Sequence, residues 1–537
     1  MAQKYDYIIV GAGSSGCVIA NRLTANPEIR VLLLEAGGPD NNPWIHIPVG
    51  YFKTLHNPKT DWCYKTEAEP ELHGRQLDWP RGKTLGGSSS INGLLYVRGQ
   101  AEDYDSWAQS GNQGWSYDDV LPLFKRSESF EEGANELHGG DGGLAVSKIR
   151  AKSKISEAFI DAAVEMGVPR TDDYNGAVQE GVAYFDQTAK KGLRCSSAKA
   201  FLKPIKARKN LVIQTNAHCH HLLFEQGNDK AVCGVAFDVK GDMRQALLKD
   251  GGEVILSAGA IGSPQLLELS GIGRGDILQK AGVRLRHESQ GVGEALQDHL
   301  QIRLVFETNV PTLNDMINSS IGKLSIGLQY GLFRGGPMSL GASQVAIFAK
   351  SMAGLDTPDI QFHFQPLSAD KPGLVMHPFS GFTSSVCQLR PESRGTIHIT
   401  SPDSHDYPKI YANYLSAKAD QLCAIRAVRF AREMAQMPAL KPFIVREHTV
   451  VGDMVSDEDH LEVARRHAQT IYHPTSTCRM GTDNQAVVSP RLAVYGIDNL
   501  RVADASIMPS IVSGNTNAPC IMIGEKAADM ILEDRQG

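Results

Sequence analysis

The stretch from residue 5 to residue 37, YDYIIVGAGSSGCVIANRLTANPEIRVLLLEAG, constrains the fold of this chain more than any other. A short apolar run, residues 7–10, has the composition of a buried parallel strand and ends directly on a G-x-G-x-x-G motif at positions 11–16. A helical pattern follows, and a second apolar run, residues 31–34, ends on Glu35. This complete βαβ unit predicts a Rossmann-like α/β domain that binds a dinucleotide.

Each residue of the motif has a physical reason to be there. Gly11 permits the tight turn, Gly13 lets the backbone approach a pyrophosphate, and Gly16 lets the helix pack closely on the strand. The helix N-terminus offers free N–H groups and partial positive charge to the phosphates. Glu35 can accept hydrogen bonds from both ribose hydroxyls and would repel a 2′-phosphate, which disfavours NADP. The motif leaves NAD and FAD open.

Length and charge narrow the class of protein. A chain of 537 residues should contain more than one hydrophobic core, so we expect two domains. The 54 basic residues are outnumbered by 60 acidic ones and form no basic block, which argues against a nucleic-acid partner. A hydrophobic content of 42% with 21% charged residues is ordinary for a globular protein.

Three features bear on location. The first predicted strand begins after four residues, so we expect no signal peptide. No apolar run approaches the ~20 residues needed to span a bilayer. The nine cysteines are odd in number and scattered, as expected of reduced thiols. Together these features predict a cytoplasmic protein, with loose association with the inner membrane as the alternative.

Residues 218–221, His-Cys-His-His, invite a metal assignment, which we reject. They lie in the alternating apolar stretch 211–224, where neighbouring side chains point to opposite faces of a strand, and no second ligand group has zinc-site spacing. We therefore predict no metal site.

The run at residues 81–94, RGKTLGGSSSINGL, is rich in glycine and hydroxyl groups and contains no acid. Such a run offers many backbone N–H groups that can cradle an anion or a flat polar ring. A flexible Gly/Ser linker is the alternative. The apolar residues Leu85, Ile91, Leu94 and Leu95 argue against it, because a free linker would not need them.

The remaining pattern predicts a second domain in the middle of the chain. Helices are expected over residues 101–124 and 155–166, and a strand over 252–257 leads into a helix at Pro264 with Ser263 as its N-cap. Further strands are expected at 211–214, 232–238, 359–364, 384–389 and 396–399, the last three in an antiparallel sheet. We expect residues 315–333 to form an ordinary packing helix, with a helix that flanks an entrance or contacts a membrane surface as the alternative.

Two stretches near the C-terminus carry candidate chemistry: IYHPTSTCRMG at residues 471–481 and SGNTNAP at 513–519. His473 is followed by a proline, which places its imidazole on a constrained turn. A lone histidine is more often a surface residue or a satisfied core residue. Asn515, before a helix expected to start near Pro519, would alone be interpreted as a cap.

Taken together, the motifs resemble the glucose-methanol-choline oxidoreductases, a family of FAD flavoenzymes, and above all their bacterial choline and alcohol dehydrogenases. The resemblance covers essentially the whole chain. It rests on the motifs GAGSSG at 11–16, RGKTLGGSSSIN at 81–92, SAGAIGSPQLLELSGIG at 257–273, GVGEALQDH at 291–299 and the two C-terminal stretches. It implies a discontinuous FAD-binding domain (1–155, 190–305 and 463–537) and an α+β substrate domain built on an antiparallel sheet (156–189 and 306–462).

The resemblance also implies the site. His473 would take the hydroxyl proton of an alcohol while hydride leaves for flavin N5, and Asn515 would hydrogen-bond the alcohol oxygen. The expected cofactor-binding residues are Gly11, Gly13, Ser14, Ser15, Gly16, Glu35, Ala36, Arg81, Thr84, Leu85, Gly86, Ser89, Asn92, Gly93, Leu94, Cys219, Ala258, Gly259, Asp504, Ala505, Thr516 and Asn517.

Departures from the family pattern narrow the prediction. In choline oxidases a histidine just before the asparagine of the GGSS run carries a covalent flavin link; Ile91 stands there, so we expect non-covalent FAD. We align the carboxylate that faces a quaternary ammonium with Gln344, an uncharged amide, and count Gln344 and Tyr472 as substrate residues. Choline is therefore disfavoured, and a less charged primary alcohol, aliphatic or aromatic, is the expected substrate.

The expected activity is an FAD-dependent alcohol dehydrogenase that passes electrons to a quinone or another carrier. An oxygen-using oxidase is a close variant. A flavin lyase or light-driven decarboxylase of the same fold is a further alternative, although the decarboxylases lack the histidine found here at His473. The presence of both His473 and Asn515 also argues against a nucleotide-sensing protein without turnover.

Overall fold

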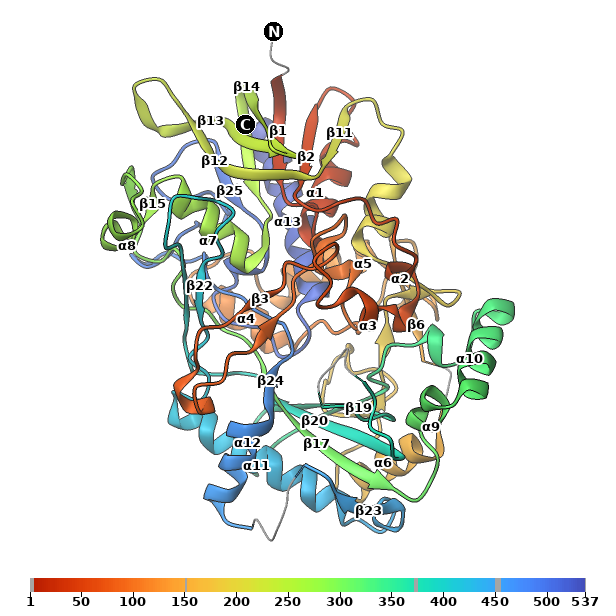
Figure 1. The fold of residues 1–537 in the computed structure, drawn as a ribbon. Coiled ribbons are helices and arrows are strands. Elements are labelled where there is room, and N and C mark those ends of the chain that lie inside the picture. The colour runs from red at the N-terminus through yellow and green to blue at the C-terminus, as the bar shows by residue number, and fades with distance from the viewer. Residues whose placement is uncertain (1–3, 150–151, 371–374, 450–454, 537) are drawn as a thin grey trace.

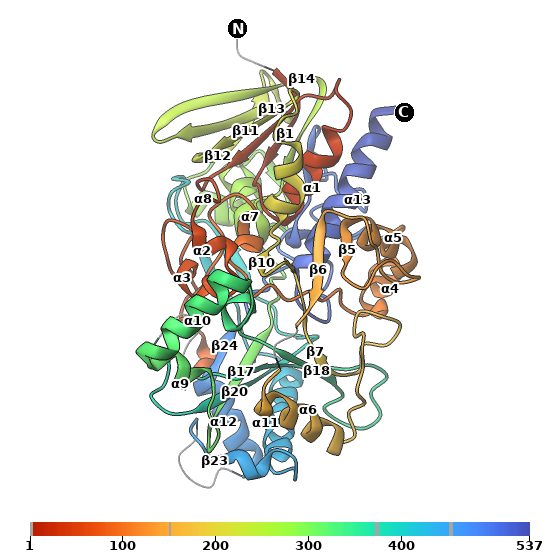
Figure 2. The same ribbon diagram turned by 90° about the vertical axis from the view of Figure 1, so that its right-hand side faces the viewer.

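The computed structural model describes residues 4–149, 152–370, 375–449 and 455–536. Two seven-stranded sheets occupy opposite ends of the molecule, as Figures 1 and 2 both show. The first sheet lies near both chain termini. The second lies at the far end, where helices α11 (Lys418–Ala435) and α12 (Asp457–His467) cover it.

The first sheet confirms the Rossmann-like prediction. Strands β1 (Lys4–Val10), β2 (Val31–Glu35), β11 (Leu211–Thr215), β14 (Asp242–Leu256) and β25 (Leu500–Val502) run parallel to their partners in this group, and β12 (Ala217–Glu225) and β13 (Asn228–Val239) add an antiparallel hairpin at one side. The order is β11-β2-β1-β14-β13-β12, with β25 pairing β14. Helices α1 (Ser14–Leu23) and α13 (Asn517–Gln536) pack together so closely that a Cβ at Gly524 would lie 2.7 Å from the Ser15 carbonyl oxygen.

The second sheet is antiparallel, as predicted. Its order is β23-β17-β20-β19-β18-β7, with β24 pairing β17. The strands are β7 (Gly181–Tyr184), β17 (Leu300–Thr308), β18 (Val345–Ala349), β19 (Ile360–Gln365), β20 (Gly381–Gln388), β23 (Ile444–Glu447) and β24 (Ala468–Thr470). Apolar side chains of helix α6 (Lys154–Glu165), of α11 and of α12 form one hydrophobic core with those of this sheet. Strands β17 and β24 belong to this sheet although they fall partly or wholly in segments predicted for the FAD-binding domain.

Two helices differ from the sequence prediction. The single helix expected over 101–124 is two helices, α4 (Ala101–Gln109) and α5 (Tyr117–Ser127), because Gly111 and Gly114 between them adopt φ of 97° and 81°. Both tryptophans of this region are buried, as expected.

Helix α7 (Gly259–Leu269) starts five residues before the predicted Pro264. Its first N–H, on Gly259, donates to the Asp504 carboxylate at 2.9 Å, and this distant residue supplies the cap. Ser263, predicted as the N-cap, instead donates its hydroxyl to the same carboxylate from inside the helix. The cap could not be found locally because it comes from another part of the chain.

The segment predicted as one packing helix at 315–333 is α9 (Leu313–Asn318) followed by α10 (Ser320–Phe333). Within α10 only Ile326 and Tyr330 are buried. The helix lies at the outside of the molecule in both views (Figures 1 and 2). The expectation of an ordinary packing helix was therefore wrong for most of its surface.

The other helices and strands are short. They are α2 (Pro43–His46), α3 (Tyr51–Thr54), α8 (Gly275–Lys280), β3 (Tyr64–Lys65), β4 (Asp78–Trp79), β5 (Glu128–Phe130), β6 (Leu144–Lys148), β8 (Asp186–Gln187), β9 (Ala189–Lys190), β10 (Leu193–Arg194), β15 (Ile272–Gly273), β16 (His287–Glu288), β21 (Thr396–His398) and β22 (Lys409–Tyr411).

Candidate active site

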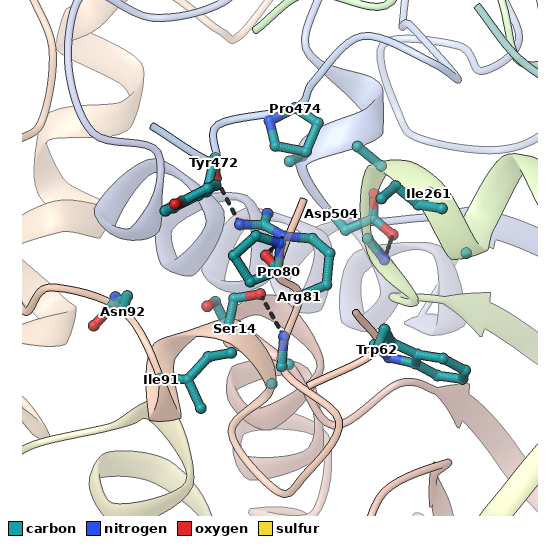
Figure 3. Close-up of a pocket in the computed structure, with 18 of the residues that line it drawn as sticks. Ser14, Trp62, Pro80, Arg81, Ile91, Asn92, Ile261, Tyr472, Pro474 and Asp504 are labelled. Atoms are coloured by element: carbon teal, nitrogen blue, oxygen red, sulfur yellow. Dashed lines mark hydrogen bonds between the residues drawn. The ribbon is translucent and has the colours of Figure 1, made fainter. Parts of the chain in front are cut away.

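A large cavity lies between the two sheets, and residues from both line it. The first sheet contributes the ends of β1 and β2, the start of β12 and the turn that follows β14. The second contributes side chains from β17 and β19. Figure 3 shows part of the wall, with Arg81 at the centre between Ser14 and Tyr472. The cavity therefore joins the predicted dinucleotide site to the predicted catalytic residues.

The glycine motif leaves room for a ligand at one position only. A Cβ on Gly11 would lie 2.3 Å from the Ser257 carbonyl oxygen, and one on Gly16 would lie 2.0 Å from the Gly11 carbonyl oxygen. At Gly13 the nearest atom would be 3.9 Å away, and this residue lines the cavity. Gly11 and Gly16 thus allow close packing, whereas Gly13 keeps open the space that a pyrophosphate needs.

Glu35 is held rigidly at the same end of the cavity. Its two carboxylate oxygens accept hydrogen bonds from the backbone N–H groups of Ala12, at 3.0 Å, and Gly37, at 2.8 Å. Burial raises the pKa of Glu35 to about 7, against the opposing effect of these hydrogen bonds. The carboxylate retains lone pairs that can accept the two hydroxyls of a ribose.

The glycine- and serine-rich run packs on the dinucleotide loop. The Gly86 N–H donates to the Ala12 carbonyl at 2.8 Å, and a Cβ on Gly87 would lie 2.8 Å from the Gly13 Cα. The Arg194 guanidinium holds Asn92 through the side-chain oxygen at 2.6 Å and the carbonyl at 2.7 Å. The alternative of a free linker is wrong, because these contacts fix the run against the cavity.

His473 sits on a strained and anchored turn. Tyr472 before it adopts φ of 70°, which is unfavourable for a bulky residue. Its carbonyl accepts a hydrogen bond from Arg81 at 2.6 Å (Figure 3). The His473 N–H donates to Asp298 at 2.7 Å, and Thr470 and Tyr414 donate their hydroxyls to the same carboxylate. These contacts stabilise the strained turn and fix the imidazole direction.

The neighbour His299 determines which ring nitrogen of His473 carries the proton. Nε2 of His299 lies 2.9 Å from the Leu389 carbonyl oxygen, which can only accept, so this nitrogen is protonated. Burial lowers the pKa of His299 to about 4, so the ring is neutral and its Nδ1 is bare. That Nδ1 lies 3.0 Å from Nδ1 of His473, which must therefore donate. Nε2 of a neutral His473 is left without a proton.

The pKa of His473 itself favours the same state. Burial lowers it well below the usual value of a histidine, and nearby His299, His363 and Arg81 lower it further. The ring therefore stays neutral at neutral pH and can accept a proton.

Asn515 completes the constellation. Its side-chain N–H group donates to Nε2 of His473 at 3.2 Å, and its oxygen accepts from Gln361 at 3.3 Å, which fixes the direction of the amide. A Cβ on the preceding Gly514 would lie 2.4 Å from Val97, so only glycine allows this approach. A hydroxyl group in the cavity beside this pair, within reach of both side chains, would meet one donor and one acceptor.

Most of the predicted site residues line the cavity. These are His473, Asn515, Tyr472 and the cofactor candidates Gly11, Gly13, Ser14, Ser15, Glu35, Ala36, Arg81, Asn92, Gly93, Cys219, Ala258, Gly259, Asp504, Ala505, Thr516 and Asn517. The others, Gly16, Thr84, Leu85, Gly86, Ser89 and Leu94, do not line it. They support the loops behind the wall through backbone contacts, such as that of the Thr84 hydroxyl with the Gly38 carbonyl at 3.0 Å.

The structure does not support the predicted role of Gln344 as a substrate residue. It is buried, its side chain faces the Ser156 hydroxyl at 3.4 Å, and it does not line the cavity. Its neighbour Ser343 does. Neighbouring side chains of an extended segment point to opposite faces, so only one of these two residues can face the cavity. Gln301, on β17, is an uncharged amide that does line the cavity.

Sequence reasoning missed several residues of the site: Asp298, His299, Gln301, Arg303, His363 and Gln365. Asp298 and His299 close the GVGEALQDH motif, so a signal was present, but nothing local connects that motif with His473. The other four lie on β17 and β19 and face the cavity only because of the strand alternation.

One group of metal-ligand types occurs among the described residues. His220, Asp238 and His405 have ligand atoms within 4.8 Å of one another, and Nε2 of His220 lies 3.0 Å from the Asp238 carboxylate. His405 comes from a distant loop and is 60% exposed. The absence of a metal site stays a prediction.

Comparisons with known proteins agree with this site. Two family models, both described as GMC oxidoreductase, match residues 5–301 and 391–524. An alcohol dehydrogenase [acceptor] from Pseudomonas putida is 43% identical, over 98% of this chain and 96% of its own length. An oxygen-dependent choline dehydrogenase from Photobacterium profundum is 41% identical, over 99% of this chain and 94% of its own length. The formate oxidase of Aspergillus oryzae, an FAD protein, has the same fold with a TM-score of 0.91, at 27% identity over 100% of this chain and 99% of its own.

The chain belongs to the glucose-methanol-choline (GMC) oxidoreductase family. It is an FAD-dependent oxidoreductase that acts on the CH–OH group of alcohols. The predictions of family, fold class, cofactor and general activity are confirmed.

Proposed function

We propose that this enzyme oxidises a primary alcohol to the aldehyde with His473 as the base and Asn515 as the group that positions the alcohol oxygen. The observation that carries the proposal is the unprotonated Nε2 of a neutral, buried His473, 3.2 Å from the Asn515 amide in a cavity shared with the dinucleotide loop. An alcohol oxygen that lies beside the two side chains, within hydrogen-bond reach of both, would donate its O–H to His473 and accept from Asn515 in place of their direct contact.

Each residue of the site has a separate role in the proposed reaction. His473 takes the hydroxyl proton on Nε2, which makes loss of hydride from the carbinol carbon easier. Asn515 and Gln361 fix the angle at which the alcohol lies. Asp298 and Arg81 hold the turn that carries His473. FAD, when bound, supplies the acceptor for the hydride.

The structure offers FAD a fitting site. Gly13, Gly93 and Gly259 line the cavity, and at each a Cβ would have either no neighbour within 4 Å or one at 3.9 Å, so their absent side chains leave space for a flat and extended ligand. Ile91 is buried, lines the same wall and offers no nucleophile, which supports non-covalent binding.

We keep the predicted two-domain division, with β17 and β24 moved to the substrate domain.

The test is to mix the purified yellow protein with a panel of primary alcohols in the absence of oxygen. Bleaching of the flavin absorbance by at least one alcohol is the expected result. A protein that binds FAD and is reduced by no alcohol would contradict the proposal. The lyase and binding-protein alternatives predict that second outcome.

Admitting oxygen, or adding a soluble quinone, to the reduced enzyme tests the acceptor. We propose a quinone or similar carrier, following the Pseudomonas putida relative, which is named for an unspecified acceptor. Slow reoxidation in air with fast reoxidation by the quinone is expected. Fast reoxidation in air would instead make the enzyme an oxidase.

We also propose a peripheral contact with a cytoplasmic membrane surface through α10. Among the described residues, no helix is long and apolar enough to cross a bilayer. Yet α10 exposes an apolar stripe at helical spacing, with fractional exposures from 54% to 81%: Ile321, Leu324, Leu328, Leu332 and Phe333. Its only charged residue, Lys323, is exposed, and the C-cap is Arg334. Apolar area flanked by cations fits an anionic lipid surface.

Flotation with phosphatidylglycerol-containing vesicles tests this contact. The wild-type enzyme should float with the vesicles, and the pair Leu324→Glu and Leu328→Glu should not. Leu422→Glu, at a 41% exposed position of α11, is the matched control and should still float. Equal recovery of all three proteins would contradict a role for α10.

A further inference from the structure

Arg303 is a buried cation on the cavity wall. It lies on β17, two residues after Gln301, so both side chains project from the same face of the sheet into the cavity. Arg303 is 4% exposed. Its Nε and Nη1 atoms have no hydrogen-bond partner among the described residues, and Nη2 makes only a long contact of 3.5 Å with the Ala369 carbonyl.

Other buried arginines of this protein show what a satisfied guanidinium looks like here. Arg98 donates to Glu128 at 2.7 Å, and Arg501 donates to Glu253 at 2.5 Å. Arg194 uses its guanidinium on three carbonyl groups and on Asn92. For Arg303, no ion pair with an acidic side chain is found within the described ranges of the chain. A buried charge without a partner is costly and is retained where something else compensates it.

The surroundings of Arg303 do not supply that compensation. After burial, the groups with the largest effect on the pKa of Arg303 are the phenols of Tyr472 and Tyr51. Burial raises the pKa values of both phenols, so they are neutral. Asp370 is mostly exposed and pairs with His377 instead. Burial lowers the pKa of Arg303, as expected of a cation that has lost its water.

The described cavity wall offers Arg303 no acidic partner. The other cation of this wall, Arg81, donates to the Pro80 and Tyr472 carbonyls. Among the described lining residues, the acids are Glu35 and Asp504. Both are tied to backbone N–H groups of the dinucleotide-binding turns. On the strands of the second sheet the cavity is lined instead by Gln301, His363 and Gln365. Burial lowers the pKa of His363 to about 4, so it too is neutral.

We propose that Arg303 binds the carboxylate of the substrate, so that the preferred substrates are alcohols that carry a carboxylate at the end opposite the hydroxyl group. This inference rests on the proposed function of His473 and Asn515. A guanidinium with free N–H groups matches the two oxygens of a carboxylate, and the pairing is strong where water is excluded. The carboxylate is a handle only: the carbinol carbon still loses hydride, and the hydroxyl proton still goes to His473.

The same charge explains why choline is a poor candidate despite the choline dehydrogenases among the relatives. A quaternary ammonium would meet a buried cation of its own sign, with no carboxylate on the described wall near it to offset the repulsion. The neutral amide of Gln301 cannot replace such a carboxylate.

The test compares matched substrates on the FAD-loaded enzyme. The ω-hydroxycarboxylates from 4-hydroxybutanoate to 10-hydroxydecanoate are each compared with the diol of the same length by kcat/KM. At the best length, the wild-type enzyme should prefer the hydroxycarboxylate by about 10- to 100-fold. Arg303→Met should remove this preference mainly through KM, whereas Arg303→Lys should retain part of it. Arg446→Met is the matched control. The Arg446 side chain is 66% exposed and pairs with Glu307 on the same sheet, so its replacement should leave the substrate preference unchanged.

A binding measurement gives a second readout without turnover. Hexanoate, which lacks the hydroxyl group, should perturb the flavin spectrum of the wild-type enzyme and of Arg303→Lys, but not of Arg303→Met at the same concentration. If Arg303→Met does not fold, the wild-type preference for the hydroxycarboxylate over the diol decides whether the assignment of Arg303 stands.

The outcomes separate the two proposals. If no alcohol bleaches the flavin, the proposed function fails. If neutral alcohols reduce the wild-type flavin as well as or better than the hydroxycarboxylates do, or if Arg303→Met keeps the wild-type preference, the assignment of Arg303 is overturned while alcohol oxidation stands.

Discussion

Replacing His299 should slow alcohol oxidation although this residue is not expected to touch the substrate. In His299→Leu the Nδ1–H of His473 loses its acceptor, 3.0 Å away in the native protein, and the Leu389 carbonyl loses its donor. The active tautomer of His473 then contains a buried, unsatisfied N–H group, so this tautomer is less stable than in the native protein. The variant should therefore hold a smaller fraction of His473 in the active tautomer.

The size of the effect follows from the cost of that group. A buried unsatisfied donor costs about 1–3 kcal/mol, which corresponds to a loss of about 5- to 150-fold in the rate of flavin reduction. His299→Gln should recover much of this, because its amide can donate to the Leu389 carbonyl and accept from His473 as the imidazole does.

Stopped-flow bleaching of the flavin by a saturating alcohol without oxygen measures this rate directly. The flavin content and the melting temperature of both variants serve as controls for folding. If the Leu variant reduces its flavin at the wild-type rate, the assignment of the His473 tautomer is refuted. Equal losses in the Leu and Gln variants would show that His299 has only a packing role.

Three further predictions test other parts of the structure. Burial would lower the pKa of His138, but hydrogen bonds to Asp173 and Glu128 raise it to about 9. The stability that the protonated ring contributes is therefore complete below pH 6.5 and is lost as the pH rises through 9. His138→Gln should accordingly lower the melting temperature at pH 6 but not at pH 10. Glu35→Gln should weaken FAD binding by about 10- to 100-fold in a fluorescence titration, because a charged acceptor for the ribose is lost, and an unchanged affinity would remove Glu35 from the site. Acid precipitation should release all the flavin into the supernatant, because Ile91 cannot form a covalent link, and a yellow pellet would contradict this.

The sequence predicted the parts of the site that depend on local pattern. The βαβ unit with Glu35 is encoded within about 30 consecutive residues, and the structure shows the expected turn, close packing and open position at Gly13. His473 and Asn515 were found from the resemblance of their own short motifs, and the structure brings the two side chains together across 42 residues of chain.

The parts that the sequence could not show depend on contacts between distant segments. His299 and His473 are 174 residues apart and meet only because β17 and β24 pair side by side. Gln344 was assigned to the substrate site, but which of the neighbours Ser343 and Gln344 faces the cavity depends on how the following strand, β18, pairs in the sheet. The buried charge of Arg303 has no local signature, since an isolated arginine in a strand usually reaches solvent. The exposure of α10 likewise could not be predicted, because it depends on which distant segments pack against the helix.

The rate of flavin reduction in His473→Ala tests the central claim most directly. We expect the variant to keep its yellow FAD and its melting temperature but to be reduced by alcohol about 10²- to 10⁴-fold more slowly than the wild-type enzyme. A variant that binds FAD normally and is reduced at close to the wild-type rate would show that another group takes the hydroxyl proton, and would contradict the account.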